Sequence, residues 1–205
     1  MPRVGLDAQT VIDAAAELAD REGLEAVSLA SLAKCLNVKP PSLYNHLDGL
    51  EGVRRALTLR GLREAHARIT RAAVGLARDD ALFAIAAAFR EFARDHPGLY
   101  TASLRAPTPG DAEHAAAGNE IVAVVVAVLS GYGLKGDDVL HATRGLRALV
   151  HGFVSLEAAG AFGLPLDLDE TFRRLLRAFI TGLQSQAAEA PHDDCSGGQC
   201  AFAPL

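Results

Sequence analysis

Hydrophobic residues in this 205-residue chain recur every three or four positions over most of its length. The clearest run is Phe172, Leu175, Leu176, Phe179, Ile180 and Leu183, with arginines between its members. A period near 3.6 residues is that of an amphipathic helix, whereas a half-buried strand alternates with a period of two. The sequence offers no pair of segments with sheet-like alternation and no internal repeat. It therefore predicts an all-α protein.

The first three helices have clear start and stop signals. Asp7 is a good N-cap, and Gly23 is a stop for the first helix. Ser28 caps a second helix, which ends at Asn37. A third begins at Pro40-Pro41, because proline lacks an N–H that would have no partner in the first helical turn. These signals predict three helices before residue 48.

Capping and breaking residues also divide the rest of the chain. Asp48 and Glu51 have the form of a capping box and start a long helix that runs to about residue 74. Helical spacing resumes near residue 78 and continues to His96-Pro97-Gly98, a breaker that also starts a short helix. Two strongly amphipathic helices follow, at roughly 138–158 and 168–184. Residues 187–205 lack this pattern and are interpreted as a disordered tail.

One segment, residues 112–132, is ambiguous. Its β-branched residues would suit a buried strand, but no second strand is available to pair with it, so a buried helix is favoured. The longest apolar run, Ile121 to Leu129, has nine residues, whereas a membrane span needs about 20. The first ten residues are polar and do not form a signal peptide. We therefore expect a soluble, cytoplasmic protein with no membrane partner.

The distribution of charge divides the chain into two parts. The formal net charge of −5 argues against a general nucleic-acid binder. Residues 1–72 hold ten Lys and Arg against nine Asp and Glu, while residues 73–205 hold ten against sixteen. A mildly basic head is thus followed by an acidic body.

Catalytic and metal-binding patterns are not found in the sequence. It contains no nucleophile elbow, phosphate-binding glycine loop or paired metal-ligand spacing, and His151 and Glu157 lie six apart on one helix and point in different directions. We therefore expect no enzyme, no catalytic residue, no cofactor and no metal. A cluster near the C-terminus could suit a soft cation or a reversible disulfide, but a solvated terminus is favoured. Its members are His192, Asp193, Asp194, Cys195 and Cys200. Cys35 is expected to be a small core residue.

The stretch from Ser28 to Leu47 points to a function. Its two short helices are joined by about four residues, as in a helix-turn-helix, whose second helix enters the major groove of DNA. Outward-facing donors cluster on that second helix, namely Lys39, Ser42, Tyr44, Asn45 and His46. Val27-Ser28-Leu29, Val38 and Ser42 to Leu47 resemble the DNA-binding head of the tetracycline-repressor (TetR) family, over roughly residues 7–57.

A second, smaller resemblance lies in the body. Leu149-Val150-His151-Gly152, followed by Gly160 to Pro165, is similar to a branch of TetR C-terminal domains with a Trp-His-Gly signature, and Val150 stands where that Trp would be. The resemblance implies a DNA-binding domain at 1–52, a ligand-binding and dimerisation domain at 53–186 and a tail at 187–205. A long fourth helix would join the first two.

The resemblance also implies roles for residues of the head. Tyr44 and His46 would hold phosphates, as would Ser28 with its helix N-terminus. The candidates for contact with base edges or the groove wall are Lys39, Pro40, Ser42 and Asn45. Many relatives carry a lysine near the start of the fourth helix, where this chain has Leu50.

For the body, the resemblance implies a homodimer and a small-molecule effector. Candidate ligand-binding residues are Phe89, Phe92, Tyr100, Tyr132, His151 and Phe153. Candidate dimer residues are Leu146, Leu149, Phe153, Phe172, Leu176, Phe179 and Leu183. In both sets the alternative is that the side chains only fill the monomer's own core. The function expected is a dimeric repressor released from a palindromic operator by an apolar, mostly uncharged effector. The alternative is a helical interaction module that has lost DNA binding.

Overall fold

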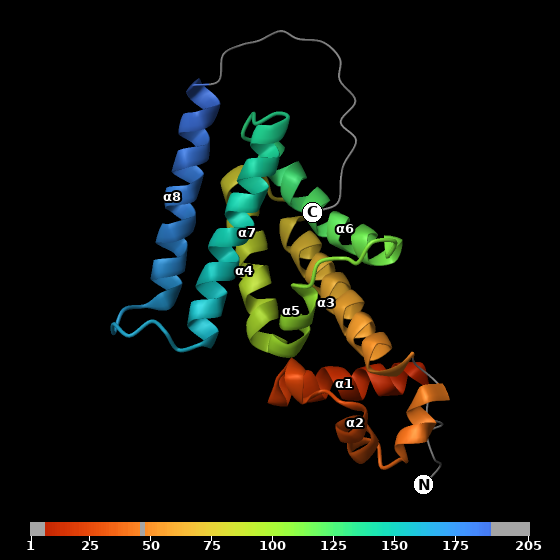
Figure 1. Ribbon diagram of the computed structural model, residues 1–205. Helices are drawn as coiled ribbons and strands as arrows, with labels where there is room; N and C mark the ends of the chain where they lie inside the picture. The colour runs from red at the N-terminus through yellow and green to blue at the C-terminus, as the bar shows by residue number, and fades with distance from the viewer. Residues whose placement is uncertain (1–6, 46–47, 190–205) are drawn as a thin grey trace. The chain divides into compact units, whose positions relative to one another are not determined.

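The computed structural model describes residues 7–45 and 48–189, and its described residues form helices and no strands (Figure 1). The α-helices are α1 (Ala8–Glu22), α2 (Leu29–Cys35), α3 (Gly49–Ala73), α4 (Arg78–Asp95), α5 (Pro97–Ser103), α6 (Ala112–Ser130), α7 (Asp137–Ala158) and α8 (Leu168–Glu189). Two 3-10 helices, η1 (Leu24–Ala26) and η2 (Pro40–Asn45), lie among the first of these. The all-α expectation is confirmed. The tail expected at 187–205 falls largely outside the described residues.

The chain divides into two compact units, each built from two segments of sequence. The first comprises residues 1–65 and 92–117, and the second residues 66–91 and 118–205. Helices α3, α4 and α6 each contribute to both units.

The predicted caps of α1 are present in the first unit. The carboxylate of Asp7 accepts a hydrogen bond from the N–H of Thr10 at 2.7 Å. At the other end Gly23 has a φ of 90°, a value that favours glycine, and its N–H bonds to the Ala19 carbonyl. The apolar face between these caps is fully buried, as its spacing predicts. Its innermost members are Val11, Ala15 and Leu18.

Helix α5 packs very closely against two other helices of the first unit. A Cβ added to Gly98 would lie 2.2 Å from the backbone carbon of Ala19 on α1, and one added to Gly61 on α3 would lie 2.5 Å from the Leu99 oxygen. The Asp20 carboxylate accepts from the N–H groups of Gly98 and Leu99 at 2.9 and 3.1 Å. Asp20 thereby satisfies N–H groups that have no partner within the first turn of α5.

In the second unit α7 and α8 lie side by side and antiparallel (Figure 1). The rings of Phe153 and Phe172 are 4.8 Å apart near one end, and Gly145 lies against Phe179 further along. The guanidinium of Arg90, only 7 % exposed, lies 5.0 Å from both phenylalanine ring centres. A buried cation that lies over both rings links α4 to both of these helices.

Helix α6 departs from the sequence analysis. The expectation of a helix is confirmed, but the expectation that it is buried is wrong, because only 17 % of its most apolar 18-residue window is buried. With a mean hydropathy of 1.4 in that window, α6 is long and apolar enough to cross a membrane, a test that helices of soluble proteins also pass. Since α4, α7 and α8 supply most of the second unit's core, Leu129 is the one fully buried residue of the run from Ile121 to Leu129.

Candidate DNA-binding interface

A reciprocal cap fixes the first helix of the predicted helix-turn-helix. The Ser28 hydroxyl accepts from the Ser31 N–H at 3.1 Å, and the Ser31 hydroxyl oxygen accepts from the Ser28 N–H at 2.9 Å. The same Ser31 hydroxyl donates to the Ala26 carbonyl at 2.8 Å. Ser28 was predicted as the cap, whereas its partner was not, because Ser31 stands where a capping box usually has Glu or Gln.

The turn after α2 closes in a Schellman motif. The Val38 N–H bonds to the Ala33 carbonyl at 3.0 Å and the Asn37 N–H to the Lys34 carbonyl at 3.3 Å. Asn37 has a φ of 53°, a left-handed conformation that asparagine adopts more readily than most residues. The chain break predicted at Asn37 is therefore confirmed.

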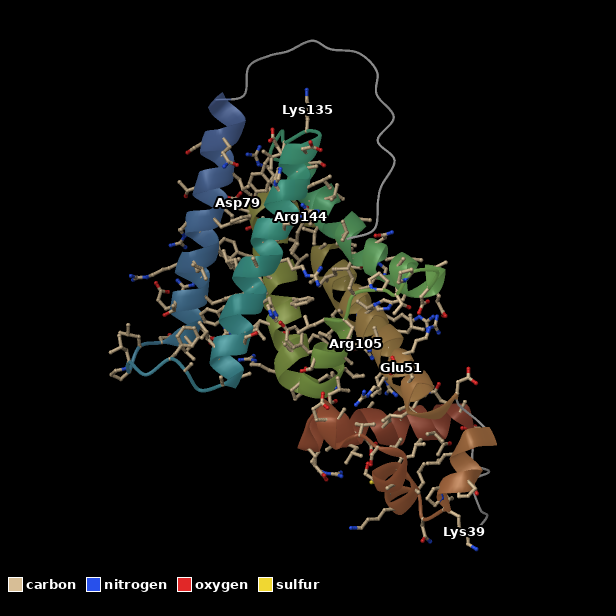
Figure 2. The ribbon with its side chains drawn as sticks, viewed as in Figure 1. Lys39, Glu51, Asp79, Arg105, Lys135 and Arg144 are labelled. Atoms are coloured by element: carbon tan, nitrogen blue, oxygen red, sulfur yellow. The ribbon has the colours of Figure 1, made fainter. Side chains whose placement is uncertain are left out.

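The short helix that follows is η2, which has 3-10 geometry at Pro40–Asn45. It begins at the predicted proline pair, and Leu43, 1 % exposed, anchors it in the core. Lys39 and Pro40 are exposed, whereas Ser42 is half-buried. Figure 2 shows Lys39 extending away from the head. The backbones of Tyr44 and Asn45 belong to η2, while their side chains and the whole of His46 are outside the described part of the chain.

Most arginines of the first unit are already paired with carboxylates. Arg55 donates to both oxygens of Asp111 at 2.7 Å and to Glu113 at 2.8 Å, and Arg63 donates to Glu113 at 2.7 Å. Further ion pairs are Arg60–Asp13, Arg54–Glu25 and Arg105–Glu51. Glu51, predicted to cap α3, thus lies beside Arg105, as Figure 2 shows.

Two lysines of the helix-turn-helix differ from these arginines. Lys34 and Lys39 are exposed, and no carboxylate of the described residues pairs with either. Lys34, in the last turn of α2, was not among the predicted DNA-binding residues, although its place beside the turn was a usable signal. Cys35 next to it is exposed, so the expectation that it is a core residue is wrong. The available positive charge of the described head therefore lies on these two lysines.

The pairing on α3 shifts the titration of its acidic partners. The Arg55 guanidinium and the N–H of His114 lower the pKa of Asp111 from 3.8 to about 2. The pKa of Glu113 is also lowered, by hydrogen bonds from Arg55 and Arg63. These carboxylates remain ionised near neutral pH and offset the charge of the arginines.

The six candidate ligand-binding residues are divided between the units. In the first, Phe92 is fully buried, and its ring is 6.4 Å from that of Tyr100 in an edge-on arrangement. In the second, Tyr132 is buried and its hydroxyl donates to Asp79 at 2.8 Å, and Phe153 is buried beside Arg90. Phe89 and His151, also in the second unit, are half-buried.

Most of the candidate dimer residues are buried within the monomer. Five of the seven are buried, namely Leu146, Phe153, Phe172, Leu176 and Leu183. Leu149 and Phe179 are half-buried. The large exposed apolar side chains on these two helices are Leu156, 49 % exposed, and Leu175, 40 % exposed. Neither was among the predicted dimer residues, because spacing alone does not separate the side that faces the core from the side that faces a partner.

Comparisons with known proteins identify the family to which the chain belongs. Residues 11–57 match the family model of bacterial regulatory proteins of the tetR family, and residues 82–179 match the tetracyclin repressor-like C-terminal domain. The uncharacterized HTH-type transcriptional regulator YobS of Bacillus subtilis is 40% identical over 183 residues, which are 89% of this chain and 95% of that protein. The uncharacterized HTH-type transcriptional regulator Rv0681 of Mycobacterium tuberculosis is 38% identical over 180 residues, 87% of this chain and 82% of that protein.

A solved structure shares the fold. A variant of TetR from Acinetobacter baumannii in complex with minocycline superposes with a TM-score of 0.66 at 24% identity, over 89% of this chain and 98% of that one. The chain belongs to the TetR family of transcriptional regulators, which bind DNA through a helix-turn-helix. Regulators of this family bind DNA and ligands and act as dimers, and they are not enzymes.

Proposed function

We propose that the chain is a homodimeric repressor that binds a near-palindromic operator and releases it when a small molecule binds. The observation that carries this proposal is the arrangement of Lys39. It stands exposed at the start of η2, between a rigid left-handed turn and the buried anchor Leu43. A cation held at that place can reach a base edge in the major groove.

Within this proposal the roles predicted from the sequence are retained. Ser28, Tyr44 and His46 hold phosphates, while Lys39 with Pro40, Ser42 and Asn45 meets base edges or the groove wall. Lys34, exposed one turn before Asn37, is a further candidate for a phosphate contact. The corresponding DNA-binding domain is residues 1–52, followed by the ligand-binding and dimerisation domain at 53–186.

Dimerisation is proposed because one head offers little free positive charge. Four arginines of α3, namely Arg54, Arg55, Arg60 and Arg63, are paired with carboxylates, so a single head neutralises few phosphates and gains little from counterion release. When two heads share a common body, the second head binds the operator at a high effective concentration, so the dimer binds more tightly than either head alone. We place the dimer contact on the exposed side of α7 and α8, where Leu156 and Leu175 join the half-buried Leu149 and Phe179.

The effector is proposed to be a small, mostly apolar molecule that binds the body. Minocycline in the A. baumannii protein is a precedent for a small molecule bound in this fold. The candidate residues remain Phe89, Phe92, Tyr100, Tyr132, His151 and Phe153. A ligand that binds better to a state with wrongly spaced heads would shift the population away from DNA.

Selection of bound sequences from a random DNA pool tests the proposal. We expect a selected motif with two inverted half-sites. Lys39→Ala should weaken binding about tenfold and relax preference at one position of each half-site, whereas Tyr44→Phe should weaken binding similarly at all sequences. Lys135→Ala is the matched control, since it removes an exposed lysine from the second unit. If Tyr44→Phe alters preference at one base pair alone, the assigned roles are wrong.

The paired arginines and Leu50 favour one second candidate, an interaction module without DNA binding. In that case no sequence would be enriched from the pool. Leu50→Lys distinguishes the two functions. In a DNA-binding protein it should raise affinity for all sequences and steepen the dependence on salt by about one counterion. In an interaction module it should restore no specific motif.

A further inference from the structure

The described residues leave a long apolar surface uncovered on α6. From Ile121 to Leu129 the helix carries no charged or polar side chain, and only Leu129 is fully buried. Ala123 and Ala127, one turn apart, are exposed, and the valines beside them are half-buried. A helix that is apolar on all sides is normally covered, and an exposed patch of this kind marks a contact site.

The chain contains a segment suited to cover this surface. Beyond Glu189, the last residue of α8, sixteen residues follow, and their last five are Ala201-Phe202-Ala203-Pro204-Leu205, without charge or hydrogen-bonding side chains. The stretch before them is acidic and polar, with Asp193 and Asp194. An apolar end on a polar connection has the composition of a tethered docking segment.

Contacts in the second unit bring the end of α8 close to the end of α6. The Tyr132 hydroxyl, two residues after α6, donates to Asp79 at 2.8 Å, and the Gln184 amide, in the last turns of α8, lies 3.4 Å from both oxygens of the same carboxylate. Figure 2 labels Asp79 between α7 and α8. Tyr132, two residues after the end of α6, and Gln184, five residues before the end of α8, therefore meet at the same carboxylate.

The connection is also long enough. The eleven residues from Glu189 to Cys200 can span up to about 36 Å. The apolar run from Ile121 to Leu129 is about 12 Å long, so the segment can reach any part of it. The segment is held at a high effective concentration because it belongs to the same chain.

We infer that residues 201–205 dock on the exposed face of α6 in the same chain, with Phe202 and Leu205 covering Ala123 and Ala127. This contact buries the valine-rich surface that the helical core leaves open. This contact gives the C-terminal residues a structural role. That role requires neither a bound metal nor a disulfide.

Disulfide trapping in the full chain tests the inference. Cys35→Ser with Cys195→Ser leaves Cys200 as the one native thiol. Ala123→Cys or Ala127→Cys then adds a second thiol on α6. In the control the second thiol is His141→Cys, at an exposed position one turn into α7. Under oxidised glutathione, the α6 thiols should form an intrachain disulfide on the order of tenfold faster than the control. Equal rates overturn the inference. A disulfide between two chains also overturns it and makes a second copy the occupant of the surface.

Two further variants separate docking from simple proximity. Phe202→Ser with Leu205→Ser should make the α6 thiols react no faster than the control thiol. Gln199→Ser should leave the faster disulfide formation unchanged. If the α6 thiols still react faster in the double serine variant, docking is contradicted. Because the chain has no tryptophan, Phe202→Trp gives a single reporter. The fluorescence emission of this variant should be that of a buried indole. Adding Ala123→Asp should shift the emission to that of an exposed indole, whereas adding His141→Asp should leave it unchanged. An exposed-type emission in Phe202→Trp alone would refute the contact.

Discussion

The two units join their helices in opposite ways. In the first, α5 lies against α1 with almost no side chain between them, because Gly98 faces the backbone of Ala19. In the second, the Arg90 side chain of α4 lies over the rings of Phe153 on α7 and Phe172 on α8, and its charge is balanced by carboxylates. Arg90 donates to Glu157 at 2.8 and 2.5 Å and lies 2.8 Å from Asp169. Close approach of two backbones is therefore the main feature of the first junction, and a buried charge with its carboxylate partners is the main feature of the second.

The arginine junction should be the more costly one to break. Arg90→Ala removes the guanidinium that donates to the partly buried Glu157 and that lies over the rings of Phe153 and Phe172. We expect a loss of about 3 kcal/mol in the free energy of unfolding, since the exposed Asp169 adds little. Chemical denaturation measures this loss. Arg90→Lys, which keeps the charge but not the fork of donors, should recover only part of it. Full recovery would mean that charge alone, and not geometry, holds the junction.

The glycine junction should fail for a steric reason. Gly98→Ala places a Cβ 2.2 Å from the Ala19 backbone, so the helices must separate, at a cost of about 2 kcal/mol. Gly118→Ala on α6 is the control, because a Cβ there meets nothing within 4 Å. It should stabilise the protein by up to about 1 kcal/mol. If Gly98→Ala and Gly118→Ala change the melting temperature by the same amount, the close approach of the helices at Gly98 does not contribute to stability.

The carboxylate at the glycine junction should contribute less than the close approach. Asp20→Ala removes the acceptor for the N–H groups of Gly98 and Leu99, and we expect a loss of about 1 kcal/mol. Asp20→Asn keeps an acceptor oxygen and should lose less. If urea unfolding shows the same loss of free energy of unfolding in both variants, Asp20 acts mainly through its charge opposite His96 and not as an acceptor for the N–H groups of α5.

The smallest effect should be seen with pH. The folded pKa of Asp111 is lowered from 3.8 to about 2, so its contribution is complete above about pH 4 and is lost as the pH falls through 2. The urea midpoint should therefore fall less steeply over that interval in Asp111→Asn than in the parent chain. An unchanged slope would show that the pairing of Asp111 with Arg55 does not persist in solution.

Local signals predicted the head well. Asp7, Ser28 and Asn37 act within a few residues of themselves, through side chains that meet nearby backbone groups, so a single stretch of sequence contains both partners. The distant pairs could not be predicted in this way. Arg90 and Glu157 are 67 residues apart, and many arginines and acids would have been equally acceptable partners by charge alone.

Faces were harder to predict than helices. The period of α8 placed Leu176 and Leu183 correctly on an apolar side, but it did not show that this side meets the monomer's own core while Leu175 remains exposed. For α6 a run of valines predicted a buried helix, but the other described helices of the unit do not bury most of that run. Hydrophobicity predicts that a surface will be covered, and it does not identify what covers it.

If η2 enters the major groove as proposed, its 3-10 geometry limits how much sequence one monomer can recognise. At about 2.0 Å per residue, its six residues are about 12 Å long. Stacked base pairs rise about 3.4 Å each, so a helix of that length lies alongside three or four of them. In the proposed operator, each half-site would then hold few discriminating bases, and the spacing between the two halves would contribute much of the operator's information.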